Sequence, residues 1–368
     1  MTDALLVSTS FPPGAGGIET YLEGLCLRLG GRISVLAPAR RDGRPIPEGI
    51  ASPVLGYPGR MALPLPRVVR AIVEAATRQS TNRVLFGSAW PLALCGPSLR
   101  RHGLRYGIIV HGAEMLVPSA TPGLRRRLVR SLADADLLLP VSEFTAGRIR
   151  SVLPEPPEHV VLRAYIDLAR FSPAANPGRA RSRLGLGPHH KVVLFLGRLV
   201  RRKGGHRLLD ILPEIAAQVP DVVLVMAGSG PQQPALRRRA GGRADVIFAG
   251  RVNEADTPGL HACASVFALP VVDRWWGSDT EGLGIALLEA QAAGVPCVTG
   301  RSGGTPEAVV DGETGFVVDA RDHDALSEAL VFILNNRDRA AAMGVAGRNH
   351  VARAFGGDLP APLLDWLG

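Results

Sequence analysis

Short apolar runs alternate with amphipathic stretches along most of the chain. The runs ALLVST (residues 4–9), RISVLAPA and RVLFGSAW are bounded by Gly, Pro or charged residues, which is typical of buried strands in a parallel sheet. Between them, apolar residues recur every three or four positions, as in a helix expected to begin near Ile18 with Tyr21, Leu22 and Leu25 on one face. Strands and helices that alternate in this way predict an α/β fold.

The strand, glycine loop and helix at the start of the chain occur a second time. KVVLFLGRLVRRKGGHRLLDILPEI, from Lys191 onward, repeats the pattern, and 368 residues suit two domains of ordinary size. Between the halves, residues 169–190 lose their periodicity and gather Pro, Gly and Arg, so we expect an interdomain linker there. This gives an N-terminal domain at 1–170 and a C-terminal domain at 188–352. The tail at about 353–368 should pack back on the first domain, because its short apolar helix cannot bury itself alone.

Composition argues against a protein that spans a membrane. No apolar run approaches the ~20 residues that span a bilayer, and the N-terminus enters a strand pattern directly, so we expect a cytoplasmic protein. The net charge of +9 comes almost entirely from arginine, since Lys191 and Lys203 are the only lysines. The cluster RRRLVR, Arg125 to Arg130, is either a solvated helix face or a contact with the anionic inner face of the plasma membrane. Nothing in the sequence points to a nucleic-acid partner.

The four cysteines are predicted to be reduced core residues. They stand singly inside apolar segments, without the paired spacing of a metal site. They are Cys26, Cys95, Cys263 and Cys297.

The stretch EGLGIALLE places two carboxylates, Glu281 and Glu289, at the ends of a Gly-punctuated apolar run. It predicts a loop that becomes a helix at about Leu283. The first amides of a helix are unpaired and lie at the positive end of its dipole, so this stretch suits an anion.

A second candidate feature lies in the glycine loop of the same half. Arg198 supplies a planar fork and Lys203 a compact charge close to a helix start, as a diphosphate requires. A surface Arg/Lys pair is the plainer alternative. Combined with the carboxylates of Glu281 and Glu289, the two cations describe a pocket for a nucleoside diphosphate sugar.

The first half offers two further candidates. Gly16 and Gly17 allow the backbone to approach a bound phosphate or sugar, or they serve a tight turn that needs positive φ. His111 follows a buried strand directly, where side chains of an open α/β sheet point into the ligand crevice. Glu114 orients this histidine, contacts an acceptor, or is an exposed carboxylate at a helix start.

Several motifs together resemble the retaining glycosyltransferases of family 4, over nearly the whole chain. They are GGIETYL, VHGAE, PVSEFT, GRLVRRKG, MAGSGP, FAGRV and EGLGIALLEAQAAGVPCVTGRSGGTPEAV. The resemblance implies the GT-B fold, in which two Rossmann-like domains with parallel sheets face each other across a cleft. FGSAWPLAL, HGAE and GGTPEAV are most similar to the actinobacterial phosphatidylinositol mannoside mannosyltransferases.

The resemblance implies roles for the candidate residues. Arg198 and Lys203 would hold the donor diphosphate, with Gly16 or Gly17 closing over phosphate and sugar and His111 beside the sugar. Glu281 would contact hydroxyls of the transferred sugar, and Glu289 would take those of the ribose. The remaining donor contacts would be the amides of the EGLGI stretch and two residues near the base: Gly282, Leu283, Gly284, Ile285, Arg251 and Val252.

The family mechanism uses no side-chain nucleophile, because the leaving phosphate helps to deprotonate the acceptor on the same face. Members of this fold use cations instead of a metal, so we expect no metal and no cofactor besides the donor substrate. Asp279 and Glu281 only mimic a metal-binding D-x-D. Trp275 and Trp276 depart from the usual shorter loop, and they either stack on a sugar or acceptor or pack in the fold.

The expected function is retaining transfer of a hexose, mannose from GDP-mannose, to a lipid-linked acceptor such as a phosphatidylinositol mannoside. One alternative is a transferase that uses a UDP- or dTDP-sugar on a soluble acceptor in natural-product, glycan or thiol biosynthesis. A UDP-sugar epimerase of the same fold is a second alternative. A non-catalytic protein that binds a sugar nucleotide or a membrane is the alternative outside enzymes.

Overall fold

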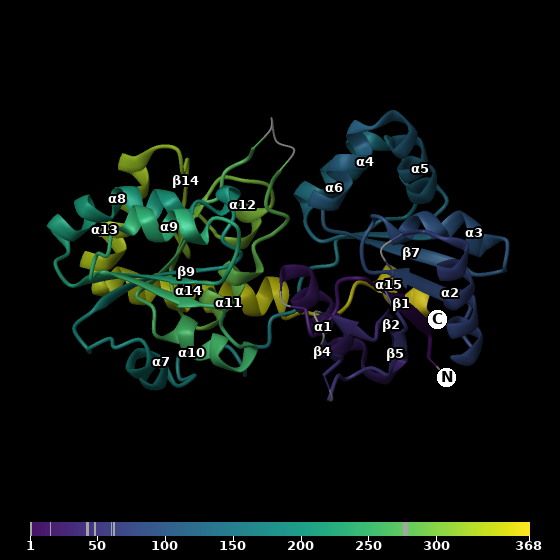
Figure 1. Cartoon of the computed structure of the whole chain (residues 1–368), viewed down its shortest axis with the longest axis horizontal. Coiled ribbons are helices and arrows are strands. Elements are labelled where there is room, and N and C mark those ends of the chain that lie inside the picture. The colour runs from purple at the N-terminus through teal and green to yellow at the C-terminus, as the bar shows by residue number, and fades with distance from the viewer. Residues whose placement is uncertain are drawn as a thin grey trace. The chain divides into compact units, whose positions relative to one another are not determined.

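The computed structural model describes residues 2–14, 16–41, 44–47, 49–59, 61, 63–274 and 279–368. The chain divides into two compact units (Figure 1). The first comprises Met1–Tyr165 with Asp358–Gly368, and the second comprises Ile166–Gly357.

The first unit contains a six-stranded parallel sheet in the order β5-β2-β1-β6-β7-β8. Its strands are β1 (Ala4–Val7), β2 (Ile33–Pro38), β5 (Val54–Tyr57), β6 (Arg83–Phe86), β7 (Arg105–Val110) and β8 (Leu137–Pro140). Its helices are α1 (Gly17–Leu29), α2 (Pro66–Arg78), α3 (Gly96–Arg100), α4 (Leu116–Ala120), α5 (Pro122–Ala133), α6 (Glu143–Val152) and α15 (Ala361–Leu367). Short 3-10 turns are η1 (Gly30–Arg32), η2 (Leu92–Cys95) and η3 (Ala113–Met115), and β3 (Arg40–Arg41) pairs antiparallel with β4 (Arg44–Pro45).

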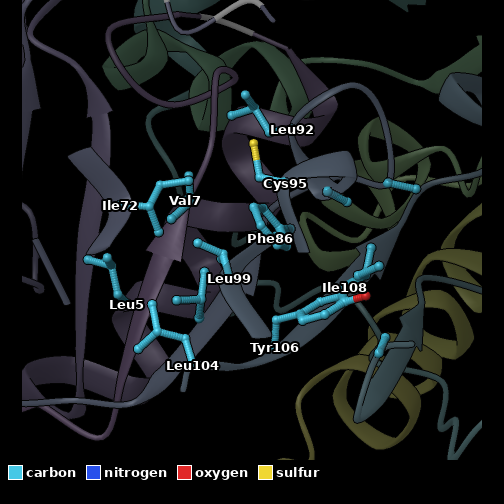
Figure 2. Packing of buried hydrophobic residues seen from close by; sticks show 14 of the residues in the cluster. Leu5, Val7, Ile72, Phe86, Leu92, Cys95, Leu99, Leu104, Tyr106 and Ile108 are labelled. Atoms are coloured by element: carbon cyan, nitrogen blue, oxygen red, sulfur yellow. The ribbon is translucent and has the colours of Figure 1, made fainter. Parts of the chain in front are cut away.

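The core of the first unit lies between this sheet and its helices. Alternate residues of β1 and of β7, which lie on either side of β6, belong to the same apolar cluster: Leu5 and Val7 from β1, and Tyr106 and Ile108 from β7 (Figure 2). The buried Tyr106 hydroxyl donates to the Ser131 carbonyl at 2.8 Å, so its polar end is satisfied. Burial of each large apolar side chain stabilises the unit by about 1.5–3 kcal/mol.

The second unit repeats the topology with a parallel sheet in the order β11-β10-β9-β12-β13-β14. Its strands are β9 (Lys191–Leu196), β10 (Val222–Ala227), β11 (Val246–Gly250), β12 (Val266–Leu269), β13 (Cys297–Gly300) and β14 (Gly315–Val318). Its helices are α7 (Pro177–Arg183), α8 (Gly205–Gln218), α9 (Gln233–Ala240), α10 (Thr257–Ala262), α11 (Ile285–Ala292), α12 (Thr305–Ala308), α13 (His323–Asn335) and α14 (Arg337–Phe355), with 3-10 turns η4 (Arg201–Lys203) and η5 (Glu254–Asp256).

The strand order of each sheet reverses once, between β1 and β6 in the first unit and between β9 and β12 in the second. Open α/β sheets bind ligands outside the carboxyl ends of their strands at such a reversal. The topology therefore directs the search for a site to the loops that follow these four strands.

The segment at 169–190 differs from the linker expected there, because it belongs to the second unit and contains α7. The Arg181 guanidinium donates to the carbonyls of Cys263, at 3.0 Å, and of Gly187 and His190, both at 2.7 Å. These hydrogen bonds hold the segment in place although α7 has no buried residue. The division between the units falls after Tyr165.

The C-terminal segment 358–368 returns to the first unit. Its helix α15 buries Leu363, Trp366 and Leu367. Within the described part of the chain, we find no helix with both the length and the apolar character needed to cross a membrane.

Candidate active site

In the second unit, the loops after β9 and β12 meet at the carboxyl edge of the sheet. The first loop ends in η4 and in Gly204, which precedes α8 with φ at 75°. A Cβ on Gly204 would lie 2.0 Å from the carbonyl oxygen of Pro270, just after β12. Only glycine allows both this backbone conformation and this close approach. The contact fixes the three basic residues of η4 beside the second loop.

Two of these basic residues bind Glu281. Lys203 Nζ lies 2.9 Å from Glu281 Oε2, and Arg202 Nη1 donates to the same oxygen. Arg202 Nε also lies 2.9 Å from Asp279 Oδ1, so one guanidinium joins both carboxylates. The side chains of Lys203 and Glu281 are only 14% and 13% exposed, which limits screening by salt.

Two opposing effects act on the pKa of Glu281. Burial raises this pKa, but the charges of Lys203 and Arg202 outweigh burial and lower it below its ordinary value. The carboxylate is therefore ionised near neutral pH and accepts hydrogen bonds. Lys203 carries three N–H donors and uses one for Glu281, which leaves two for a ligand such as a phosphate group.

Arg198 lies outside this charge cluster. Its side chain is exposed and forms no hydrogen bond or ion pair with any residue in the described ranges. The sequence predicts that Arg198 and Lys203 act together, whereas in the structure Arg202 and Lys203 share a contact with Glu281. A free guanidinium keeps all its donors for a ligand, so the role of Arg198 as a diphosphate ligand stays a prediction.

The helix after Glu281 is α11, which begins at Ile285 and not at Leu283. Gly284 precedes it with φ at 89°, which keeps Leu283 out of the helix. The Glu281 carbonyl is packed so closely that a Cβ on Gly303 would lie 1.9 Å from it. Glu281 is thus held at its side chain by Lys203 and Arg202 and at its carbonyl by the close approach of Gly303. Binding of an anion by its amides, from Gly282 onward, stays a prediction.

Glu289 lies in the second turn of α11, with its side chain 11% exposed. Its Oε2 lies 3.3 Å from Nε2 of His261, on α10. A carboxylate oxygen can only accept, so Nε2 carries the proton and donates. His261 is fully buried.

Arg251 and Val252, the expected neighbours of the nucleobase, line a cavity of about 680 Å³. The cavity lies between β11, α7 and α10, and its wall includes Phe248 and Leu260. An apolar wall with a basic rim suits an aromatic base next to a charged group.

In the first unit, Gly16 precedes α1 and Gly17 is its first residue. Gly16 has φ at 168°, an extended conformation open to any residue, so the alternative of a turn that needs positive φ is wrong. A Cβ on Gly16 would meet Glu19 Oε2 at 2.8 Å, which is the far end of a flexible side chain.

His111 follows β7 and is 8% exposed. Its Nε2 donates to the Gly87 carbonyl, just after β6, at 2.9 Å, and its ring meets the Tyr21 ring edge-on at 5.2 Å between centroids. Glu114 Oε1 accepts from the backbone amide of His111 at 2.7 Å. Glu114 is therefore not a free surface carboxylate; it fixes the backbone that carries the histidine.

Sequence reasoning missed Arg202 and His261 of the second unit, and it named Asp279 only as part of a D-x-D mimic. Each is defined by a contact with a residue far away in the chain, and only the RRK run at Arg201 to Lys203 gave a local signal. Asp279 pairs with Arg202, and the described residues contain no group of three or more His, Cys, Asp or Glu placed to hold a metal ion. Trp275 and Trp276 lie outside the described residues.

Comparison with known proteins identifies similar chains. Residues 179–350 match the family described as glycosyl transferases group 1. The GDP-mannose-dependent alpha-(1-6)-phosphatidylinositol monomannoside mannosyltransferase of Mycolicibacterium smegmatis is 40% identical, covering 94% of this chain and 92% of the relative. The enzyme of the same name from Mycobacterium tuberculosis is 38% identical, and the match covers 100% of this chain and 98% of the relative.

Among solved structures, sucrose-phosphate synthase from Thermosynechococcus elongatus superimposes with a TM-score of 0.80. The match covers 96% of this chain and 95% of that one at 22% sequence identity, a level at which the likeness shows the fold alone. The predicted α/β fold of the GT-B class, with two Rossmann-like parallel sheets, is confirmed.

Proposed function

Because the chain belongs to the group 1 glycosyltransferases, we propose that it transfers mannose from GDP-mannose to a lipid-linked acceptor of the phosphatidylinositol mannoside class. The observation that carries the proposal is its 38–40% identity, over 94% or more of the chain, with relatives named for this reaction.

The donor binds along the carboxyl edge of the second unit. Within this unit, Lys203 and Arg198 hold the diphosphate. Glu281, ionised and held by Arg202, accepts hydrogen bonds from hydroxyls of the transferred sugar. Glu289 accepts from the ribose, and the base lies by Arg251 and Val252, whose cavity supports this assignment.

Transfer proceeds with retention at the anomeric carbon. The bond from that carbon to the diphosphate oxygen breaks, and the acceptor oxygen bonds to it on the same face. The acceptor proton passes to an oxygen of the departing diphosphate. Lys203 stabilises the negative charge that develops there, which is the kind of contribution that preorganised charges make best. With Lys203 and Arg198 available as cations, the reaction needs no metal.

The acceptor is reached at an anionic membrane surface through α5. Arg125, Arg126 and Arg127 are exposed on this helix, and Arg130 is 74% exposed, while Leu128 packs inward. Each basic residue near such a surface contributes about 1 kcal/mol. This charged face supports peripheral binding on the cytoplasmic side.

A thermal-shift panel of nucleoside diphosphates and their sugars tests the donor. At about 100 times the dissociation constant, a ligand that binds only the folded state stabilises it by about 2.7 kcal/mol, or on the order of 5–10 °C for a domain of this size. We expect this shift with GDP and GDP-mannose. A shift with UDP or dTDP instead would favour the soluble-acceptor alternative, and no shift with any nucleotide would contradict the proposal.

A further inference from the structure

His261 is a polar side chain in an apolar part of the second unit. It is 0% exposed, and its ring packs against Phe171 at 5.9 Å and Phe267 at 5.3 Å between centroids. Within the described ranges, its side chain forms one hydrogen bond, from Nε2 to Glu289 Oε2, and Nδ1 is buried without a partner.

Packing alone does not explain a histidine at this position. A leucine or phenylalanine would fill the space between Phe171 and Phe267 without an unpaired ring nitrogen, whose burial without a hydrogen bond is unfavourable. What the imidazole adds is one donor aimed at Glu289. The advantage of histidine therefore lies in what it does to that carboxylate.

The two oxygens of Glu289 differ. Oε2 accepts from His261, whereas Oε1 forms no hydrogen bond with the described residues and is not enclosed by them. A free glutamate side chain rotates about three bonds, and ordering such a chain when a ligand binds costs conformational entropy. The hydrogen bond from His261 orders Glu289 before the ligand arrives and leaves Oε1 to accept from it.

We propose that His261 is a positioning residue that sets the preference for ribonucleotide donors by orienting Glu289 toward the ribose hydroxyls. The inference rests on the proposed function, in which Glu289 is the ribose ligand. It adds a residue from α10 that never contacts the donor but determines how strongly the ribose is recognised.

The test compares the dissociation constants of GDP, 2′-deoxy-GDP and 3′-deoxy-GDP by calorimetry on the full-length protein. A hydrogen bond to a charged group corresponds to about tenfold to hundredfold in affinity, so the native protein should prefer GDP over at least one deoxy analogue by that factor. His261→Phe keeps the aromatic packing and removes the donor. This preference should then fall to about threefold or less, through weaker GDP binding and unchanged binding of the analogue.

Two further variants separate positioning from folding. His261→Gln offers an amide N–H in place of Nε2–H and should recover much of the preference, while Glu289→Gln should lose it as His261→Phe does. His261→Leu replaces His261→Phe if the latter does not fold. His102→Phe, at an exposed histidine of the first unit, is the matched control and should keep the native preference.

The outcomes are distinct. A preference that persists in His261→Phe but disappears in Glu289→Gln overturns the positioning role and leaves the proposed function standing. Equal binding of GDP and both deoxy analogues by the native protein overturns the inference at its first step. Failure of the native protein to bind GDP at all is instead a failure of the proposed function.

Discussion

Lys203→Ala is the substitution that most directly separates catalysis from folding in this chain. It removes one of the two cations that bind Glu281, at the edge of the sheet where the diphosphate is proposed to lie. Lys203 is 14% exposed, so its charge acts in a partly desolvated site.

The expected loss of activity follows from that burial. Two unit charges about 4 Å apart at an effective dielectric of about 20 interact by about 4 kcal/mol. Removal of a single preorganised donor at an active site costs a similar amount, about 10²–10³ in kcat. We therefore expect kcat to fall by about 10²–10³, with a smaller change in the KM of the donor, because the charge on the leaving group is greatest in the transition state.

The effect on folding should be moderate. Glu281 keeps its hydrogen bond to Arg202 and is not left as an unpaired buried charge, so we expect a loss of about 1.5–3 kcal/mol, or roughly 3–12 °C in Tm for a domain of this size. Lys191→Ala is the matched control, since the chain has only two lysines and the hydrogen bond of Lys191 Nζ, to Asn335 Oδ1 at 3.2 Å, lies away from the charge cluster at Glu281. Steady-state transfer of mannose and calorimetric melting are measured on all three proteins. A kcat within threefold of the native value in Lys203→Ala would refute the assignment of this lysine to the diphosphate.

Four further predictions concern charge, thiols and surface. In the folded protein the pKa of Glu281 lies below its ordinary value of 4.5, so the carboxylate contributes its full stabilisation above about pH 4.5 and loses it as the pH falls through the folded pKa. Urea unfolding from about pH 3 to 6 should show this loss of stability. Glu281→Gln should lose less stability than the native protein on acidification. Burial raises the pKa of the Cys26 and Cys263 thiols to about 11 and that of Cys95 to about 12, and it raises the pKa of Cys297 further. A thiol reagent at neutral pH should therefore label none of the four until the protein is unfolded. Rapid labelling of the native protein would contradict their burial. Chelation with EDTA should leave the transfer rate unchanged, and a loss that Mg²⁺ or Mn²⁺ restores would show that a metal takes part. Binding to anionic vesicles should weaken as salt rises, and the double variant Arg125→Ala, Arg126→Ala should weaken it at low salt; binding indifferent to ionic strength would exclude the charged face of α5 as the contact.

Much of the architecture is readable from local pattern. Ser142 illustrates this, because a serine between an apolar run and a helical pattern predicts an N-cap, and its Oγ accepts from the Thr145 amide at 3.1 Å. The sequence also predicts a helix near Pro66 to Gln79, and α2 spans Pro66–Arg78. Edge strand β5, in contrast, lies in the Pro-rich stretch 45–66, which shows no strand pattern, because the strand's residues are only partly covered and need no apolar run.

Residues 169–190, before β9, differ from the expected linker for a related reason. Periodicity reports an apolar face, but residues 169–190 are held in part by guanidinium groups that bind backbone carbonyls. Arg348 reaches the carbonyls of Phe171 and Leu168, at 2.8 and 3.0 Å, from α14 nearly 180 residues away. Hydrogen bonds of this kind leave no pattern in the sequence around them.

The candidate site shows the same division. Lys203, Glu281 and Glu289 stand out by type and spacing, and the structure gives each a charged or hydrogen-bonded setting. Arg202 and His261 become visible only when the fold brings η4 to the loop after β12 and α10 to α11. A residue that orients a ligand-binding side chain is identified by its contact with that side chain in the folded protein. A single sequence does not show such contacts.

The most direct test of the central claim is transfer itself. The purified chain is incubated with GDP-mannose and a phosphatidylinositol mannoside in anionic vesicles, and the lipid product is analysed by mass spectrometry and NMR. We predict one added hexose in α linkage, formed with GDP-mannose and not with UDP- or dTDP-sugars. Transfer that requires a UDP- or dTDP-sugar or a soluble acceptor, or no transfer by a folded protein that binds GDP, would contradict the proposed function.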